Sequence, residues 1–246
     1  FDGGFVLKRM DYNIGEGPWA DVSAVANEIE IKFHVVAAPA AAAKSKTPTP
    51  TAVQKGQSMK KFIALAIAAG FFSTASAATE IYTIESTHTL PRFEYNHLGY
   101  SVQLSRFDKT TGTITLDRAA KTGSVDVTID TTSVNTGYPL FNQHIQGEDF
   151  LATAQFPTAT YKSTAVNFKG DAPATIEGNL TLKGITKPVT LTVVSFHCMP
   201  HPMLKKDACG ATATAKVKRT DFNMGKNTPY VGDELTITLP VEAYKP

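Results

Sequence analysis

The sequence predicts an all-β protein whose main domain is an antiparallel eight-stranded β-barrel with a short helical lid or plug. From residue 78 onward, apolar and polar residues alternate in about eight short runs, separated by Gly, Asp, Asn and Pro. Such alternation is typical of antiparallel strands. Each run has a single apolar face, so the sheet must pair with another sheet or close on itself, and closure also removes exposed edges. Eight strands close into a barrel wide enough for its own side chains or one thin ligand.

The predicted strands follow one another from residue 89 to residue 241, with apolar residues mostly at every second position. Their inward positions are, in chain order, Thr89, Pro91, Phe93, Tyr95 and His97; Ile114 and Leu116; Val125, Val127 and Ile129; Tyr161, Val166 and Phe168; Ile176, Leu180 and Leu182; Val189, Leu191 and Val193; Ala211, Ala213, Ala215 and Val217; and Leu235, Ile237, Leu239 and Val241. Polar residues such as Arg92, Glu94 and Asn96 take the opposite face.

The strand pattern breaks between Tyr138 and Phe156. Leu140, Ile145, Phe150 and Leu151 fit a short helix or lid there, and Pro157 returns the chain to an extended course. At the mouth of a barrel this segment is either a gate or a plug that completes the core, and periodicity does not separate the two.

Composition excludes several functional classes. The chain has 246 residues, of which 42% are hydrophobic, and a net charge of +2. It can therefore bury a core, and it lacks the basic surplus typical of nucleic-acid binding. No apolar run is long enough to span a membrane. Because P-loop, nucleophile-elbow, zinc-protease and dinucleotide motifs are all missing from the sequence, we expect neither an enzyme nor a cofactor.

A secretion signal lies inside the chain. Met59-Lys60-Lys61 precedes the apolar run Phe62 to Phe72, and Ala75-Ser76-Ala77 follows as a cleavage pattern. This order is typical of a secretory signal peptide rather than of a buried core helix. We therefore expect residues 59–77 to be a signal peptide that starts at Met59 and directs residues 78–246 to the periplasm.

The residues before the signal repeat part of the main domain. The segment from Lys8 to Gly15 matches the segment from Lys218 to Gly225, with Lys, Arg, Asp, Asn and Gly identical. After a four-residue offset Glu28, Ile31, Val35 and Ala37 match Glu234, Ile237, Val241 and Ala243. We expect residues 1–37 to be the C-terminal fragment of a second, related domain, poorly ordered or loosely docked, and residues 38–58, rich in Ala, Thr and Pro, to be a flexible linker.

Several motifs resemble the YceI-like polyisoprenoid-binding family. They are Thr87-His88-Thr89, Phe93, His97-Leu98-Gly99, Ser101, Phe107 and Gly112; His144 with Asp149-Phe150; the stretch from Phe156 to Thr164; the stretch from Gly178 to Val189; and the stretch from Lys218 to Phe222. Together they span most of residues 78–246, and residues 1–37 resemble the C-terminal segment of the same family. The resemblance implies an exported, lipocalin-like barrel that holds a long isoprenoid or similar amphiphilic chain in an apolar tunnel.

The sequence departs from that family at a few positions. Phe141-Asn142 stands where the family often has Arg-Asp, Ser105 where it has glycine, and Pro91 where it has valine. The first change removes a positive charge near the mouth, and anions favour arginine forks. A neutral head group, such as a quinone ring or a fatty amide, is therefore favoured over a pyrophosphate.

The candidate ligand-binding residues combine strand parity with the family motifs. They are Phe93, Tyr95, His97, Ile114, Val127, His144, Phe150, Tyr161, Phe168, Leu182 and Leu191. The aliphatic and aromatic members are candidates for the wall, with ordinary core packing as the alternative. His88, His97 and His144 are candidates for orienting a head group, with a structural hydrogen bond as the alternative.

Two cysteines flank a turn-rich segment. In an exported protein Cys198 and Cys209 are expected to form a disulfide across this hairpin. A metal site with His197 and His201 is the weaker alternative, because the spacing fits no standard zinc pattern.

Two functional hypotheses of different class follow. The first is a periplasmic protein that binds an isoprenoid, quinone-like or fatty-chain lipid for transport, storage or scavenging. The second is an exported structural or interaction domain with a filled barrel and no lipid. No nucleic acid is expected as a partner, and a homodimer and transient contact with a membrane are both compatible with the sequence.

Overall fold

The computed structural model describes residues 2–12, 14–15, 17–23, 25–34 and 79–246, and its chain divides into two compact units, Phe1–Ser76 and Ala77–Pro246. The predicted linker, residues 38–58, and the predicted signal peptide, residues 59–77, lie outside the described residues. Within the described part of the chain, no helix combines the length and the apolar character needed to cross a bilayer.

The first unit is a two-stranded antiparallel hairpin. It contains β1 (Asp2–Lys8), η1 (Arg9–Tyr12), η2 (Gly17–Ala20) and β2 (Glu28–His34), where η marks a 3-10 helix. Lys8 lies opposite Glu28, and Phe5 lies opposite Ile31. Val35 and Ala37, which the internal repeat also includes, lie outside the described residues.

A buried arginine organises the loop of this hairpin. Arg9 is only 4% exposed. Its guanidinium donates hydrogen bonds to backbone carbonyls of the loop that precedes β2, those of Ile14, Gly15, Asp21, Val25 and Ala26. A local cage of carbonyls thus fixes the loop without a hydrophobic core around it.

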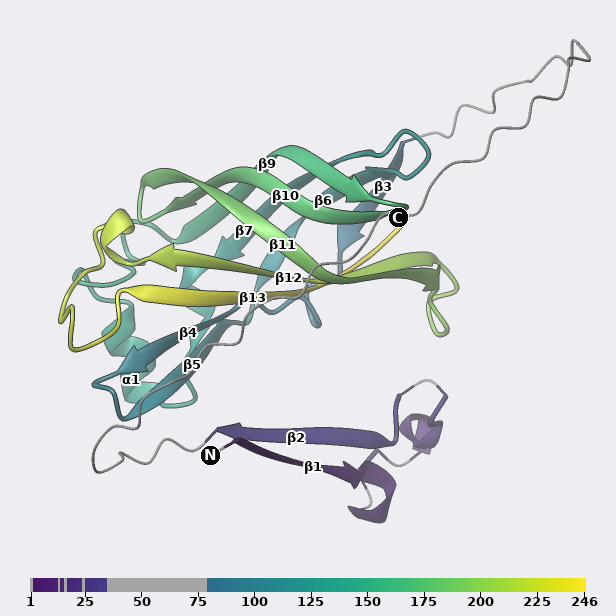
Figure 1. The fold of residues 1–246 in the computed structure, drawn as a ribbon, viewed down its shortest axis with the longest axis horizontal. Helices are drawn as coiled ribbons and strands as arrows, with labels where there is room; N and C mark the ends of the chain where they lie inside the picture. The colour runs from purple at the N-terminus through teal and green to yellow at the C-terminus, as the bar shows by residue number, and fades with distance from the viewer. Residues whose placement is uncertain (1, 13, 16, 24, 35–78) are drawn as a thin grey trace, which may run out of the picture. The chain divides into compact units, whose positions relative to one another are not determined.

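The second unit contains one large antiparallel sheet, one α-helix and two short 3-10 helices (Figure 1). The elements are β3 (Glu80–Ile84), β4 (Arg92–His97), β5 (Ser101–Phe107), β6 (Thr110–Asp117), β7 (Thr122–Asp130), η3 (Thr131–Ser133), β8 (Val134–Asn135), α1 (Pro139–Ile145), β9 (Thr158–Lys169), β10 (Ala172–Leu182), β11 (Ile185–Pro200), β12 (Asp207–Lys218), η4 (Thr220–Phe222) and β13 (Glu234–Tyr244).

Eight strands of this sheet close into a ring, which confirms the predicted antiparallel barrel. Their order is β12-β11-β10-β9-β7-β6-β3-β13, and β13 pairs back onto β12. The pairing of β12 with β13 runs from Ala208 opposite Tyr244 to Lys218 opposite Glu234. The closing contact with β3 is short, with Ala243 opposite Ile84. The remaining edge of β13 pairs with β4, which continues the sheet into β5 and β8.

Three strands of the second unit, β3, β5 and the two-residue β8, were not among the eight predicted runs. In β5 the apolar side chains of Val102 and Leu104 point to solvent, at 60% and 52% exposure, while Ser105 on the other face is 2% exposed. The usual apolar-inside pattern is therefore inverted over residues 102–105 of β5, although Phe107 at its end is buried, and hydrophobic periodicity cannot detect such a strand. The predicted first strand begins later than expected, at Arg92, although Thr89 and Pro91 are buried.

The segment predicted as a lid covers one end of the barrel, next to β4 and β5 (Figure 1). Helix α1 starts at Pro139, whose fixed φ suits the first turn. Ile145 and Leu151 are buried, and Leu140 lies within α1, as the predicted helix or lid requires, with its side chain 62% exposed. Phe141 and Ile145, one turn apart on α1, pack against the core, whereas His144 is exposed at the edge of the barrel interior.

The predicted disulfide is present. Cys198 and Cys209 are bridged and lie directly opposite each other in the ladder of β11 and β12. His201, the flanking residue of the alternative metal site, instead accepts hydrogen bonds through Nδ1 from the backbone amides of Met203 and Leu204, at 3.2 and 3.1 Å. These bonds shape the turn between the two strands.

A candidate lipid cavity in the barrel

An apolar cavity of about 290 Å³ occupies the lid end of the barrel. Its volume is close to the lower end of the range for small-molecule sites, roughly 300–1,000 Å³. The walls come from β4, β9, β10, β11, β12 and β13, and α1 with the turns after it forms the cover. Alternating inward side chains of long strands thus create the cavity, because every second residue faces the same interior.

Eight of the eleven predicted ligand-binding residues line this cavity. They are Phe93, Tyr95, His97, His144, Phe150, Tyr161, Leu182 and Leu191. Ile114 and Val127 instead line a second cavity of about 100 Å³, which Leu191 also borders. Phe168 packs against the buried cluster of Tyr82, Leu116 and Ala243. The structure therefore brings the predicted residues into the barrel interior, and their contact with a ligand stays a prediction.

The cavity runs from a solvent-facing rim to a closed interior. His97 and His144 are exposed, whereas Phe93, Tyr95 and Tyr161 are each less than a tenth exposed. The His144 ring lies between two aromatic rings, with centroid distances of 6.0 Å to Phe141 and 5.0 Å to Phe150. A ligand inside would therefore meet the imidazoles only at the rim.

Two lysines tie the cover to neighbouring turns. Lys183 Nζ donates to the carbonyl oxygens of Glu148 and Asn223, at 2.6 and 2.9 Å. Lys226 Nζ lies 3.2 Å from a carboxylate oxygen of Asp149. These contacts hold the turns after α1, while α1 itself is attached through apolar packing and through hydrogen bonds that Asn142 Oδ1 accepts from the amide and hydroxyl of Thr136, each at 2.7 Å. If the cover opens, we expect α1 rather than residues 148–149 to move.

Arg219 stands in the cavity wall but has no free donor. It is 6% exposed, and its donor atoms bond to the carbonyls of Gly232, Met224, Lys226 and Val231 and to the hydroxyl of Thr228. A guanidinium has five N–H groups, so all are used. Burial lowers the pKa of Arg219, and the charge of Asp233 opposes that effect. This arginine cannot offer a bidentate fork to a phosphate without breaking the loop that it holds.

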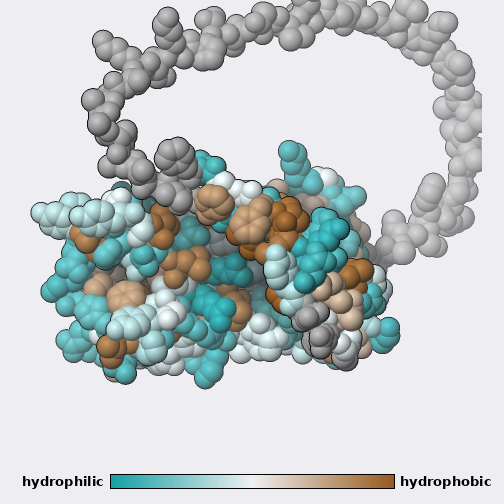
Figure 2. Space-filling view, turned by 90° about the horizontal axis from the view of Figure 1, so that it is seen from below, coloured by the Kyte–Doolittle hydropathy of each residue, from teal (hydrophilic) through white to brown (hydrophobic). Residues whose placement is uncertain are grey.

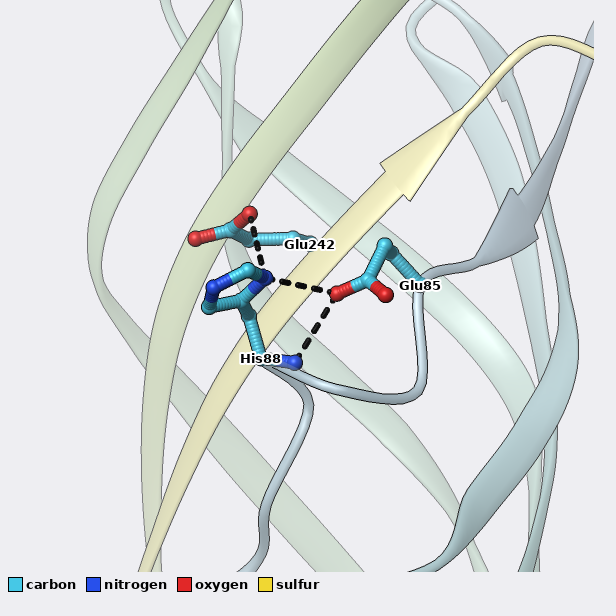
Figure 3. Close-up of side chains that lie close together, drawn as sticks. All are labelled: Glu85, His88 and Glu242. Atoms are coloured by element: carbon cyan, nitrogen blue, oxygen red, sulfur yellow. Dashed lines mark hydrogen bonds and ion pairs between the residues drawn. The ribbon is translucent and has the colours of Figure 1, made fainter. Parts of the chain in front are cut away.

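His88, a predicted head-group residue, lies outside both cavities. Its Nδ1 is 2.8 Å from Glu85 and 3.7 Å from Glu242, at the surface near the start of β4 (Figure 3). Glu85 also accepts hydrogen bonds from the backbone amides of Thr87 and His88. Burial raises the pKa of Glu85 but these hydrogen bonds outweigh it, so its pKa lies below the usual value. The structure therefore does not bring His88 to either cavity, and its side chain takes part in a surface turn, in line with the alternative of a structural hydrogen bond.

Sequence reasoning missed the part of the wall that comes from loops. Met224, Asn227 and Val231, between β12 and β13, line the cavity. A loop has no hydrophobic period, so strand parity cannot assign its side chains to a face. The one available signal was the motif around Arg219, whose hydrogen bonds place these residues.

Comparison with known proteins identifies relatives of this chain. The family model described as YceI-like domain matches residues 82–243. "Protein YceI" of Escherichia coli O157:H7 is 38% identical over 186 residues, which cover 74% of this chain and 96% of that protein. "Protein YceI" of Salmonella arizonae is 37% identical over the same length and coverage.

Solved structures share the fold at lower identity. BcnA of Burkholderia cenocepacia superposes with a TM-score of 0.55 at 23% identity, covering 65% of this chain and 98% of that one. The YCEI protein of Campylobacter jejuni gives 0.54 at 24% identity, with 61% and 90% covered. A polyisoprenoid binding domain from Saccharophagus degradans gives 0.50 at 16% identity, with 67% and 98% covered.

Proposed function

The chain belongs to the YceI-like family, and we propose that it binds an isoprenoid or similar long-chain lipid in the barrel, in order to transport, store or scavenge that lipid in the periplasm. The observation that carries this proposal is the cavity itself: a closed barrel holds an apolar space with exposed imidazoles at its rim. The structural neighbour from Saccharophagus degradans is a polyisoprenoid binding domain, which supports the same ligand class.

The energetics favour an apolar chain. Each methylene moved from water into such a space contributes about 0.8 kcal/mol, so a five-carbon isoprene unit contributes several times that. The walls supply aromatic and branched aliphatic side chains, among them Phe93, Leu182 and Leu191. Binding therefore grows with the number of buried carbons rather than with specific polar contacts.

The rim favours a neutral head group. Arg219 has no free donor, and Phe141 and Asn142 stand at the base of the cover instead of a charged pair. A quinone ring or an amide can accept a hydrogen bond from His97 or His144, and the aromatic rings on either side of His144 can stack on a flat head group.

Exposed apolar side chains next to the rim support transient contact with a membrane. Leu98 follows the rim residue His97, and the Leu98 amide donates to the carbonyl of Tyr230 at 2.9 Å. Leu98 is 46% exposed, Tyr230 73% and Tyr138, just before α1, 60%. Figure 2 shows one face of the molecule on which apolar side chains, in brown, reach the surface between hydrophilic ones in teal. A lipid leaving a bilayer would meet Leu98, Tyr230 and Tyr138 before it enters the cavity.

Two features support a periplasmic location. The signal-like segment starting at Met59 would export residues 78–246. The bridged pair Cys198 and Cys209 suits an oxidising compartment. A homodimer stays a prediction.

The test is lipid recovered from protein secreted by a bacterial host. Protein expressed from Met59 is purified from the periplasm, and its bound lipid is measured by native mass spectrometry and organic extraction. We expect an N-terminus at or next to Ala78 and a copurified long-chain lipid. Ala215→Leu fills the cavity at an inward position, and Lys216→Leu is the matched change on the outer face.

The two variants separate the hypotheses. We expect folded Ala215→Leu protein to lose most of its lipid and Lys216→Leu protein to keep it. A folded wild-type protein without lipid would favour the structural-domain hypothesis, whereas equal lipid in both variants would show that the lipid binds outside this cavity. Retention of residues 1–58 on the exported protein would contradict the predicted signal peptide.

A further inference from the structure

Two apolar cavities lie next to each other inside the barrel. The larger lies under the cover, and the smaller, of about 100 Å³, lies toward the end closed by Tyr82 and Phe196. Leu191 and Leu239 border both cavities. The two spaces therefore share a thin partition.

Tyr161 lines the larger cavity and not the smaller one. It belongs to a buried cluster with Leu191, which borders both cavities, and with Ala213 and Ala215. Ala215 lines the larger cavity, and Ala213 lines the smaller one. A side chain packed against both lies at the level where the two spaces meet.

The hydroxyl of Tyr161 fixes its ring in this position. Tyr161 Oη donates to the carbonyl oxygens of Ile176 and Val189, at 2.9 and 3.0 Å. Ile176 lines the smaller cavity and Val189 the larger. The hydroxyl therefore bridges β10 and β11 at the junction, which orients the ring across the interior. Burial, with the charge of Glu177, raises the pKa of Tyr161 to about 12, so the phenol stays a donor at neutral pH.

Gly178 makes room for the ring. A Cβ at residue 178 would lie 2.6 Å from Tyr161 Cζ and 2.7 Å from Tyr161 Oη. The β9–β10 pairing is also irregular between Glu177 and Gly178, where the register shifts. Sequence and backbone thus accommodate a tyrosine that points inward and reaches the neighbouring strands.

We propose that Tyr161 is the floor of the lipid site: it sets the longest chain that the larger cavity accepts, and the smaller cavity is a second binding space that stays separate while the ring is in place. The inference rests on the proposed lipid binding and specifies its chain-length limit. The ligand class is a linear isoprenoid or aliphatic chain whose end reaches Tyr161. Removing the ring joins the two cavities, so longer chains gain buried surface.

The experiment measures affinity as a function of chain length. Delipidated protein is titrated with geraniol, farnesol, geranylgeraniol and longer isoprenols, competing with a bound fluorescent fatty-acid probe. We expect the wild-type affinity to rise with length and then to level off. In Tyr161→Ala the plateau should shift by at least one isoprene unit, and the first isoprenol beyond the wild-type plateau should bind roughly tenfold more tightly or better. Tyr161→Leu, a milder change, should shift the plateau in the same direction if the alanine variant does not fold.

Two further variants complete the test. Ala211 lines only the smaller cavity, so Ala211→Leu should restore the wild-type plateau in the Tyr161→Ala background. Lys162, next in the chain, pairs with Asp126 on the outer face at 3.0 Å, and Lys162→Ala should leave the plateau unchanged. An unshifted plateau in folded Tyr161→Leu protein would overturn the inference and leave lipid binding intact. A wild type that binds no isoprenol or fatty-acid probe would overturn the proposed function and this inference together.

Discussion

The molecule contains the same hairpin twice, once as β1–β2 and once as β12–β13. In both, Lys lies opposite Glu at the loop end, Lys8 with Glu28 and Lys218 with Glu234. In both, the next arginine is buried and donates to the carbonyl five residues ahead, Ile14 for Arg9 and Met224 for Arg219, at 3.0 and 2.7 Å. The local structure is therefore shared down to individual hydrogen bonds.

The two hairpins differ in what covers their apolar face. Phe5 and Phe33 are 55% and 49% exposed, whereas Ala215, at the position equivalent to Phe5, is 9% exposed. The register and the arginine cage thus arise from residues within the hairpin, because both copies have them. Burial of the face requires the other strands of a barrel, which a two-stranded sheet cannot supply.

The largest expected effect comes from the arginine that both hairpins share. Arg219→Ala removes five donors from buried acceptors, so we expect the free energy of unfolding of the barrel to fall by about 3 kcal/mol or more. The matched variant Arg9→Ala should remove hydrogen-exchange protection from residues 2–34 and leave the main urea transition unmoved. If Arg9→Ala lowered the free energy of unfolding in the main urea transition as much as Arg219→Ala, the first hairpin would contribute to the stability of the barrel.

The disulfide is a second difference between the two hairpins. It joins β12 to β11, whereas β1, the strand equivalent to β12, contains no cysteine. The double variant Cys198→Ser and Cys209→Ser should lose about 2–3 kcal/mol in urea unfolding, through the added freedom of the unfolded chain. Native unreduced wild type should show no reactive thiol, and wild type in reductant should match the variant. Two labelled thiols in native protein would contradict the bridge.

The same comparison shows how far sequence reasoning could reach. Alternation predicted the barrel and placed Phe93, Tyr161 and Leu182 in its interior, because parity is a local property. It could not predict that Tyr161 divides the interior, since that depends on carbonyls of β10 and β11 and on the space at Gly178. The inverted strand β5 and the wall residues from loops were missed for the same reason: their burial is decided by tertiary packing rather than by periodicity.

The smallest expected effect concerns the anchor at the end of β13. Lys245 Nζ donates to Glu80 at 2.7 Å and to Asp207 at 3.0 Å, which ties the C-terminal residues to β3 and β12. The hydrogen bond from Lys245, followed by that from Tyr82, lowers the pKa of Glu80 below its ordinary value of 4.5. Because the folded-state pKa is lowered, this contribution to stability is fully present above about pH 4.5 and is lost as the pH falls through the folded-state pKa.

Glu80→Gln should therefore destabilise the barrel near neutral pH by at most about 1 kcal/mol, because the side chains of Glu80 and Lys245 are each about one-third exposed and water screens the pair. The difference in free energy of unfolding between wild type and variant should shrink toward zero as the pH falls below the folded-state pKa of Glu80, where both carry a neutral side chain at residue 80. Glu148→Gln, on the exposed turn after α1, is the control and should show no such pH-dependent difference. A Glu80→Gln difference that persists unchanged in acid would mean that the side chain acts through packing or its hydrogen bond with Tyr82, and that Lys245 does not hold the seam between β3 and β13 by charge.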